Sequence, residues 1–426
     1  MSAIERLPEI DNGLLRFLTC GSVDDGKSTL IGRLLYDTKA ILADTLHAMA
    51  RTSQRRGLET VDLSLLTDGL SAEREQGITI DVAYRYFSTG RRKYIIADAP
   101  GHEQYTRNMV TAASSANLAI ILVDARKGVL TQTRRHSYLA HLLGIPHIVV
   151  AINKMDLVGY DQATFERIRG DYLKFAATLG IGDVSFIPLS ALRGDMIVDR
   201  GERLDWYQGP TLLEILEGAP SAHSERDERF RFPVQFVCRP QQAGDPKLHD
   251  YRGYMGRVES GEIAVGDEVV VLPSEKPSRV KAIEIHGRSL PRAIAEQSVT
   301  LLLEDEVDIC RGDMIVKVGE SAQVTRRIET MLCWLGDSPL DPQRKYLIRQ
   351  TTRETRAALE AVEYRLDINT LQRMPAERLG MNDIARVSFK LAQPLCVDAY
   401  AENRATGAFI VIDETSNNTV GAGMIL

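Results

Sequence analysis

Residues 21–28 read Gly-Ser-Val-Asp-Asp-Gly-Lys-Ser, and they stand directly between an apolar run and a helical pattern. This stretch fits G-x4-G-K-[S/T], in which glycines let backbone N–H groups curl around phosphate oxygens. In that pattern Lys27 supplies charge to the β- and γ-phosphates, and the Ser28 hydroxyl is a ligand of Mg²⁺. A chance match in a glycine-rich turn is the alternative, and the strand before it and the helix after it argue against chance. The stretch predicts a nucleoside-triphosphate site in an α/β domain, lined by Gly21, Ser22, Val23, Asp24, Asp25, Gly26, Lys27, Ser28 and Thr29.

The segments around this loop alternate between short apolar runs and amphipathic stretches from about residue 15 to residue 217. The expected helices include Thr131–Leu143 and Ala163–Leu179. The expected strands are apolar at consecutive positions, as in strands that helices cover on both faces. They are Leu15–Cys20, Tyr94–Asp98, Leu118–Asp124, His147–Asn153 and Val184–Leu189. Such alternation predicts an α/β domain with a doubly wound, mostly parallel sheet.

A second motif, Asp-Ala-Pro-Gly-His at 98–102, ends the expected strand Tyr94–Asp98. A carboxylate at the C-terminal end of such a strand lies in the crevice where open α/β sheets bind ligands, so Asp98 can reach the metal through water. Gly101 allows its backbone N–H to approach the γ-phosphate, and the loop can move when that phosphate leaves. Asp-x-Pro-Gly is also an ordinary turn, but its place at a strand end favours the functional interpretation.

Two further motifs predict which nucleotide base the site binds. Asn153-Lys154-Met155-Asp156 closes the expected strand His147–Asn153, and the Asp156 carboxylate can accept hydrogen bonds from guanine N1–H and the exocyclic amine. Adenine offers no such pair of donors, so this carboxylate selects guanine, while the Lys154 stem covers the base. Past the following strand comes the tripeptide Ser190, Ala191 and Leu192, where a backbone N–H would meet guanine O6. Together the motifs predict a GTP-hydrolysing switch with Mg²⁺.

The pattern of expected secondary structure changes after a segment of small, polar residues at Gly218–Arg229. Beyond it, short β-rich runs punctuated by Gly and Pro predict two small β-barrels. We expect a GTP-binding domain over 1–220 and barrel domains over 228–325 and 326–426. Within the last domain, Thr352–Leu366 favours helix by its Ala, Glu, Arg and Leu content, so a barrel would have to override that preference. The Arg-Gly-Asp at 311–313 is expected to be a barrel turn.

Composition excludes some classes of protein. The formal charge of −6 argues against a chain whose main work is coating DNA. The N-terminus has no apolar signal core, and no apolar stretch approaches the length of a membrane span. The five cysteines form no CxxC pair, which fits a reducing compartment rather than a zinc or disulfide framework. The sequence predicts a cytoplasmic protein without a membrane or DNA partner.

With these motifs in this order, nearly the whole chain resembles the translation-factor class of GTPases. Residues 74–81, Arg-Glu-Gln-Gly-Ile-Thr-Ile-Asp, look like the first switch of that class. The resemblance implies that Thr79 binds Mg²⁺ and the γ-phosphate. It also implies that His102, which follows Asp-x-Pro-Gly, is the catalytic residue that orients the attacking water. The alternative for His102 is an ordinary residue at a helix N-terminus.

Within that class, the chain most resembles the large, GTP-binding subunits of bacterial sulfate adenylyltransferase (ATP sulfurylase). The resemblance lies in GSVDDGKSTL, where typical elongation factors carry histidines in place of Ser22 and Asp25, and in DGLSAEREQGITIDVAYRYFS at 68–88. It implies a heteromeric partner, a small catalytic subunit that joins ATP and sulfate into adenylyl sulfate and pyrophosphate, driven by GTP hydrolysis on this chain. Some members continue into an adenylyl-sulfate kinase domain with its own phosphate loop, and residues 218–426 contain no such motif.

Two other functions share this fold and this site. An elongation factor would deliver aminoacyl-tRNA to the ribosome, and a regulatory GTPase would serve some other assembly. The basic stretch 343–356 (QRKYLIRQTTRETR) could dock RNA, although such a run is more often a solvated face. Ser22, Asp25 and the 68–88 run favour the sulfate adenylyltransferase subunit.

Overall fold

The computed structural model describes residues 13–41, 43–55, 61, 63–66, 82–101, 106–220, 229–240, 251–367 and 370–426. The chain divides into two compact units, Met1–Ala222 and His223–Leu426. No helix in these described stretches combines the length and apolarity needed to cross a membrane. Each of the five cysteines is a free thiol.

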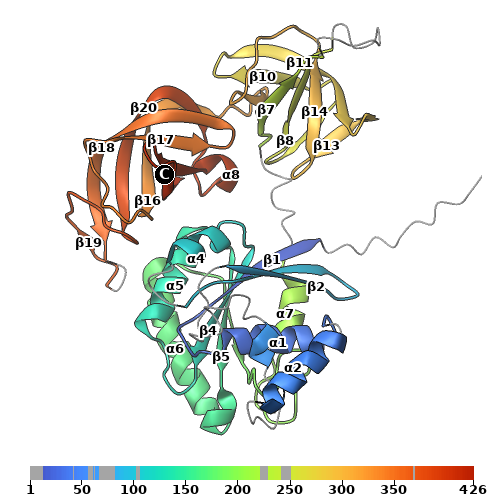
Figure 1. The fold of residues 1–426 in the computed structure, drawn as a ribbon, viewed down its shortest axis with the longest axis vertical. Helices are drawn as coiled ribbons and strands as arrows, with labels where there is room; N and C mark the ends of the chain where they lie inside the picture. Colours follow the sequence, from blue (N-terminus) through green and yellow to red (C-terminus); the bar gives the residue numbers. More distant parts are fainter. Residues whose placement is uncertain are drawn as a thin grey trace, which may run out of the picture. The chain divides into compact units, whose positions relative to one another are not determined.

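The first unit is built on a six-stranded sheet with the order β2-β3-β1-β4-β5-β6 (Figure 1). All neighbours are parallel except β2, which runs antiparallel to β3 at the edge. The strands are β1 (Leu14–Cys20), β2 (Ala83–Ser88), β3 (Lys93–Asp98), β4 (Leu118–Asp124), β5 (His147–Asn153) and β6 (Val184–Pro188). The predicted doubly wound sheet is confirmed, and β4 is buried along its whole length, as its unbroken apolar run predicts.

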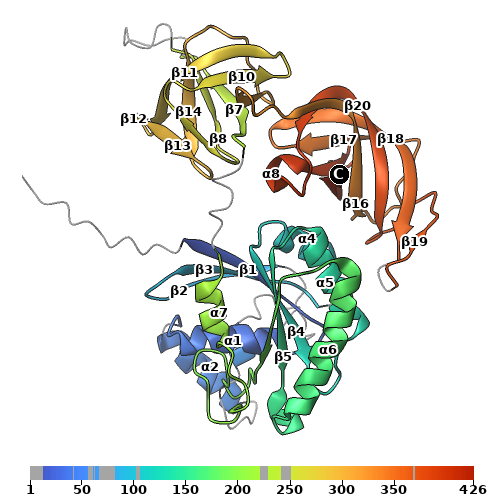
Figure 2. The same cartoon turned by 180° about the vertical axis from the view of Figure 1, so that it is seen from behind.

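Helices cover both faces of this sheet (Figures 1 and 2). On one face, Leu30, Ile31 and Leu34 of α1 and Leu212 of α7 pack with strand side chains in one core. Helices α5 and α6 lie on the opposite face. The helices are α1 (Lys27–Asp37), α2 (Ala43–Arg55), α4 (Thr106–Ala113), α5 (Thr131–Leu142), α6 (Gln162–Leu179) and α7 (Leu212–Gly218), with short turns η1 (Leu63–Leu66) and η3 (Met155–Val158).

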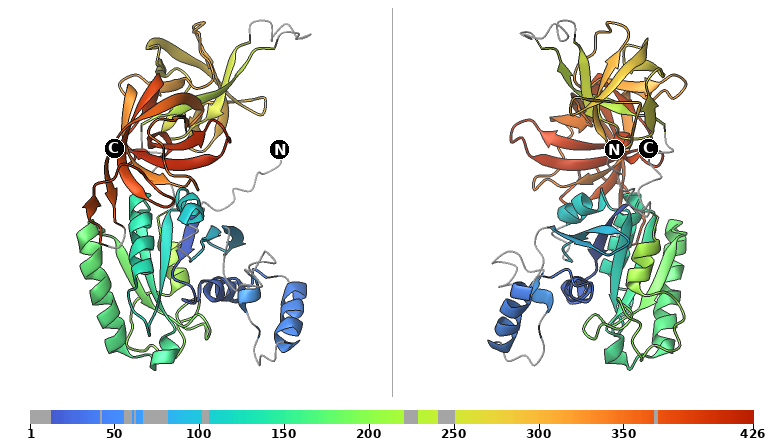
Figure 3. Two further views of the ribbon diagram at one scale, coloured as in Figure 1. Left: turned by 60° about the vertical axis from the view of Figure 1, so that its left-hand side comes forward. Right: turned by 90° about the vertical axis from the view of Figure 1, so that its right-hand side faces the viewer.

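Helix α2 stands away from the sheet (Figure 3), and η1 returns the chain to α1. The contact depends on Gly32, because a Cβ atom there would overlap the carbonyl oxygen of Leu63. The backbone of η1 therefore lies directly on α1, close to the helix turn that follows the phosphate loop.

The second unit contains two closed barrels. The first has the strand order β10-β15-β7-β8-β14-β11-β12 and is closed by β10–β11, and β9 pairs with β13 beside it. Its strands are β7 (Phe232–Cys238), β8 (Gly253–Arg257), β9 (Glu262–Ala264), β10 (Glu268–Leu272), β11 (Lys276–Ile285), β12 (Arg288–Leu290), β13 (Arg292–Ile294), β14 (Ser298–Leu303) and β15 (Met314–Lys317). The Arg-Gly-Asp sequence precedes β15 as a turn in which Asp313 accepts from Cys310 N.

The second barrel has the order β17-β21-β22-β16-β20-β18-β19 and is closed by β17–β18. Its elements are β16 (Gln323–Trp334), β17 (Lys345–Gln350), β18 (Arg353–Leu366), β19 (Arg373–Met374), β20 (Ile384–Val397), α8 (Arg404–Gly407), β21 (Ala408–Asp413) and β22 (Thr419–Ile425). The helix preference of Thr352–Leu366 is wrong, since all of this segment after Thr352 forms β18. Pairing with β17 on one side and β20 on the other outweighs an intrinsic preference that is weak per residue.

The basic stretch 343–356 lies mostly on β17 and β18, and its arginines are paired with carboxylates. Arg344 bonds Asp413, Arg349 bonds Glu354, and Arg356 bonds Glu414. These pairs neutralise most of the stretch, so the structure favours a solvated face over a surface for docking RNA.

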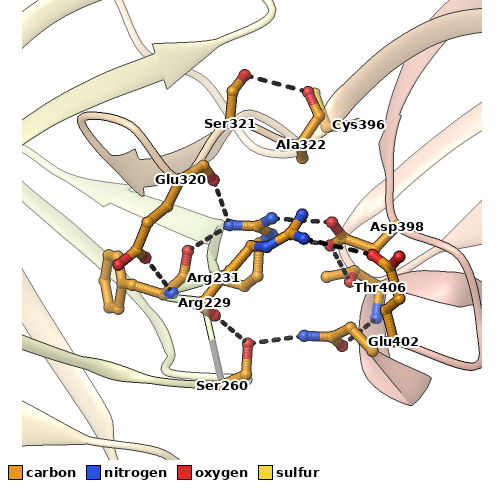
Figure 4. A network of polar contacts seen from close by, with 12 residues as sticks. Arg229, Arg231, Ser260, Glu320, Ser321, Ala322, Cys396, Asp398, Glu402 and Thr406 are labelled. Atoms are coloured by element: carbon orange, nitrogen blue, oxygen red, sulfur yellow. Dashed lines mark hydrogen bonds and ion pairs between the residues drawn. The ribbon is translucent and has the colours of Figure 1, made fainter. Parts of the chain in front are cut away.

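A buried ion pair joins the two barrels (Figure 4). Arg231, just before β7, is 0% exposed, and its Nε and Nη2 each lie 2.8 Å from an oxygen of Asp398, which follows β20. Nη1 donates to the carbonyl oxygens of Phe230 and Glu320. Burial alone would raise the pKa of Asp398, but hydrogen bonds from Arg231 and Thr406 hold that pKa below its usual range. The barrels are thus connected by a fully hydrogen-bonded pair.

Candidate guanine-nucleotide site

The predicted motifs meet at one edge of the sheet, because the C-terminal ends of parallel strands lie side by side. Thr19 pairs with Asp98 in register, and its hydroxyl donates to Asp98 Oδ1 at 3.2 Å. Asp124 pairs in the same way with Asn153. The phosphate loop after β1 therefore lies beside the Asp98 loop, and one strand, β4, separates β1 from the strand that ends at Asn153.

The phosphate loop ends at the N-terminus of α1, where Gly26 is the cap residue with φ 94° and no side chain caps the helix. The first N–H groups of α1 are therefore left to an external acceptor such as a phosphate. Lys27 Nζ donates to the carbonyl oxygens of Gly21 at 3.0 Å and Ser22 at 3.1 Å. Burial lowers the pKa of Lys27, and Asp98 and Asp25 oppose that shift. The structure thus places a buried cation at the centre of the loop.

Two glycines are required because neighbouring side chains lie too close to leave room for a Cβ atom. A Cβ atom at Gly26 would lie 2.5 Å from Asn153 Nδ2, and one at Gly101 would lie 2.6 Å from Lys27 Nζ. Gly26 also has a positive φ of 94°, which L side chains rarely adopt. The loops that carry Gly101 and Asn153 therefore both contact the phosphate loop directly.

Asp25 is buried inside the phosphate loop. Its Oδ2 accepts from Ser22 N at 2.7 Å, whereas its Oδ1 and the Ser22 hydroxyl have no hydrogen-bond partner among the described residues. Burial raises the pKa of Asp25 to about 6. Of the other predicted loop residues, Val23, Ser28 and Thr29 are half-buried and Asp24 is exposed.

The base-selecting motifs are connected to the phosphate loop and to each other. Asn153 Nδ2 donates to Asp25 O at 2.8 Å, while its Oδ1 accepts from Ala191 N at 2.9 Å. Ser190 Oγ donates to Asp156 Oδ1 at 2.7 Å. Leu192 is exposed, and its carbonyl accepts from Arg33 of α1. The predicted residues on the base side are thus brought together around Asn153. Thr79 and His102 lie outside the described residues.

Comparison with known proteins places this site in a family. Residues 12–221 match the Elongation factor Tu GTP binding domain, and residues 327–426 match the GTP-eEF1A C-terminal domain-like family. Sulfate adenylyltransferase subunit 1 of Cellvibrio japonicus is 55% identical over 97% of this chain and 86% of its own length. The same subunit of Laribacter hongkongensis is 55% identical over 97% of this chain and 85% of its own length.

The chain belongs to the sulfate adenylyltransferase subunit 1 family. Its first unit is therefore a GTP-binding domain, and its fold is that of a GTPase domain followed by barrels. The name of this family implies a further subunit in those relatives.

One part of the site in this family member is not singled out by the sequence motifs. Asp124, at the end of β4, accepts two hydrogen bonds from the Arg126 side chain and lies 3.0 Å from Lys154 Nζ. Burial alone would raise the pKa of Asp124, but these bonds hold it well below its usual range. Lys154 also contacts the Asp24 carbonyl. The only sequence signal was a carboxylate at the end of a buried strand.

The donor set at the phosphate side suits a magnesium ion. Asp98 is 1% exposed at the end of β3, and Ser28 stands in the first turn of α1. Carboxylate and hydroxyl oxygens are hard ligands of the kind that Mg²⁺ prefers.

Proposed function

We propose that this chain hydrolyses GTP and that hydrolysis drives formation of adenylyl sulfate and pyrophosphate from ATP and sulfate on a separate small subunit. The observation that carries the proposal is 55% identity to sulfate adenylyltransferase subunit 1 over 97% of the chain. A single phosphate-loop motif, followed by a guanine motif, supports the division of labour, because ATP then needs a site on a partner. The complex would act in the cytoplasm.

In this proposal the phosphate loop and the N-terminus of α1 bind the triphosphate through backbone N–H groups. Lys27 donates to the β- and γ-phosphates in place of its present bonds to Gly21 and Ser22. Ser28, Thr79 and Asp98 would hold Mg²⁺, which neutralises phosphate charge when bound. Gly101 N–H contacts the γ-phosphate, and its loop responds when that phosphate is lost.

On the base side, Asp156 accepts from guanine N1–H and the exocyclic amine, and a backbone N–H of Ser190–Leu192 donates to O6. Asn153 fixes the position of this pair through its bonds to Asp25 and Ala191. An adenine base would offer the Asp156 carboxylate neither of these donors, so the hydrogen bonds that favour guanine would be lost. His102 would orient the water that attacks the γ-phosphate.

The experiment that tests this function compares GTP turnover by the purified chain under two conditions. One contains the small subunit with ATP and sulfate, and the other contains ribosomes with aminoacyl-tRNA. The proposal predicts stimulation only in the first condition. Stimulation by ribosomes alone would instead establish an elongation factor and would contradict the sulfate-activating role.

A further inference from the structure

The loops that carry the base-reading groups are joined at a second place, beyond the contact between Asp156 and Ser190. The first loop runs from Asn153 through η3 to Tyr160, and the second runs from Ser190 to Asp195. Tyr160 OH donates to Asp195 Oδ2 at 2.7 Å. The Tyr160–Asp195 bond therefore closes a ring of contacts that contains both Asp156 and Ser190.

Tyr160 is held in an uncommon backbone conformation. Its φ of 57° follows a φ of 64° at Gly159, and a non-glycine residue in this region marks a constraint imposed by its surroundings. Its N–H donates to Met155 O at 2.8 Å, and its carbonyl accepts from Trp206 Nε1 at 2.9 Å. The backbone contacts place the phenol ring at the end of the first loop independently of its hydroxyl.

Asp195 is equally constrained in the second loop. Ser190 N donates to Asp195 O at 3.2 Å, and the two residues form an isolated antiparallel bridge. Its carboxylate lies against Gly201, where a Cβ atom would come within 2.5 Å of Oδ1. Asp195 is therefore bonded directly to Ser190, whose hydroxyl donates to Asp156.

Arg203 also contacts the Tyr160 side chain. Its Nη1 donates to Tyr160 OH at 3.2 Å, and its guanidinium lies 5.7 Å from the centre of the Tyr160 ring. A phenol that accepts from a cation and donates to a carboxylate is polarised in both directions, which strengthens each hydrogen bond.

We propose that Tyr160 and Asp195 are positioning residues for guanine recognition, holding the Asp156 and Ser190 loops in the register that reads the base. This inference rests on the proposed GTP-binding function. Neither residue touches the base in this account, because they act through Ser190 and Asp156. Removing the Tyr160 hydroxyl alone should leave the fold intact and weaken the contact between Asp156 and Ser190.

The test is Tyr160→Phe, which keeps the ring and both backbone contacts. Hydrogen bonds to charged groups are among the stronger ones, so we expect GTP to bind about tenfold more weakly, by equilibrium titration. ITP lacks the exocyclic amine that donates to Asp156, so its affinity should fall less, and the GTP-to-ITP affinity ratio should decrease. Asp195→Ala should reproduce this loss, while Asp195→Asn should restore binding because its amide oxygen still accepts from Tyr160.

Tyr207→Phe is the matched control, since its hydroxyl donates to Phe186 O and makes no hydrogen bond to either base-reading loop among the described residues. It should leave the ratio unchanged. An unchanged GTP affinity in Tyr160→Phe, or an equal loss for GTP and ITP, would overturn the positioning role. Asp156→Asn tests the underlying function separately, because this variant should bind XTP in preference to GTP. If Asp156→Asn keeps the GTP preference, the base-reading assignment itself fails.

Discussion

The phosphate loop and the interface between the barrels are both buried clusters of charge, but their polar atoms are partnered differently. At the interface, Arg231 makes four hydrogen bonds, and both oxygens of Asp398 are used. In the phosphate loop, Ser22 Oγ and Asp25 Oδ1 are buried without a partner among the described residues. Lys27 Nζ there donates to two carbonyl oxygens of its own loop.

This difference separates a structural cluster from a binding site. Leaving a buried polar atom unpartnered costs about 1–3 kcal/mol, so such atoms persist where a ligand can offset that loss or where function requires them. A fully bonded pair needs no ligand and contributes to one fixed arrangement of its surroundings. The interface should therefore govern stability, and the phosphate loop should govern nucleotide affinity.

The largest expected effect is on stability at the interface. Asp398→Ala leaves the Arg231 guanidinium buried without its counter-charge, and breaking such a pair costs about 3–5 kcal/mol. Chemical denaturation of the second unit in the full chain should show this loss, with GTP affinity unchanged.

Two further variants sharpen this prediction. Glu354→Ala removes the exposed Arg349–Glu354 pair and should cost less than about 1 kcal/mol. Arg231→Met with Asp398→Leu removes both charges and should recover much of the stability. A small effect of Asp398→Ala would mean that the interface pair is not structural.

Next in size is the effect of Lys27→Ala on nucleotide binding. Loss of its charge-assisted bonds to phosphate should weaken GTP binding about a hundredfold, measured by titration with Mg²⁺ present. The denaturation midpoint should stay the same or rise, because a buried cation has been removed. Lys174→Ala, at a side chain 84% exposed on α6, is the control. An unchanged GTP affinity in Lys27→Ala would refute the phosphate-loop assignment.

A smaller effect concerns pH and Asp25. Its pKa in the folded chain is raised from 3.8 to about 6, so between about pH 4 and 6 the folded state binds more protons than the unfolded state. Stability of the nucleotide-free chain should therefore fall as pH rises through that window. Asp25→Asn should flatten this dependence and stabilise the chain at pH 7 by on the order of 3 kcal/mol. Parallel pH profiles for the two proteins would contradict this.

Much of the first unit follows from its sequence, because its strands are continuous apolar runs and its loops carry spaced motifs. The predicted runs at β4 and β5 match the strands residue for residue. Strand β18 could not be predicted, since its pairing with β17 and β20 outweighs the local preference for helix. Edge strand β2 was missed because it alternates half-buried and exposed positions up to Phe87.

The site was predictable only where a motif is contiguous. Asp398 is 167 residues from Arg231, and Asp195 is 35 residues from Tyr160, so no local pattern joins either pair. Asp25 could be recognised as an unusual phosphate-loop residue, but its burial and its raised pKa emerge only from the folded loop.

Pyrophosphate release tests the central claim most directly, because the claim assigns the energy source to this chain and the adenylyl transfer to a partner. The chain alone, given ATP and sulfate, should release none. The pair with the small subunit should release pyrophosphate in a GTP-dependent way, and a non-hydrolysable GTP analogue should depress that release. Release by the chain alone, or release by the pair that is indifferent to GTP, would contradict the account.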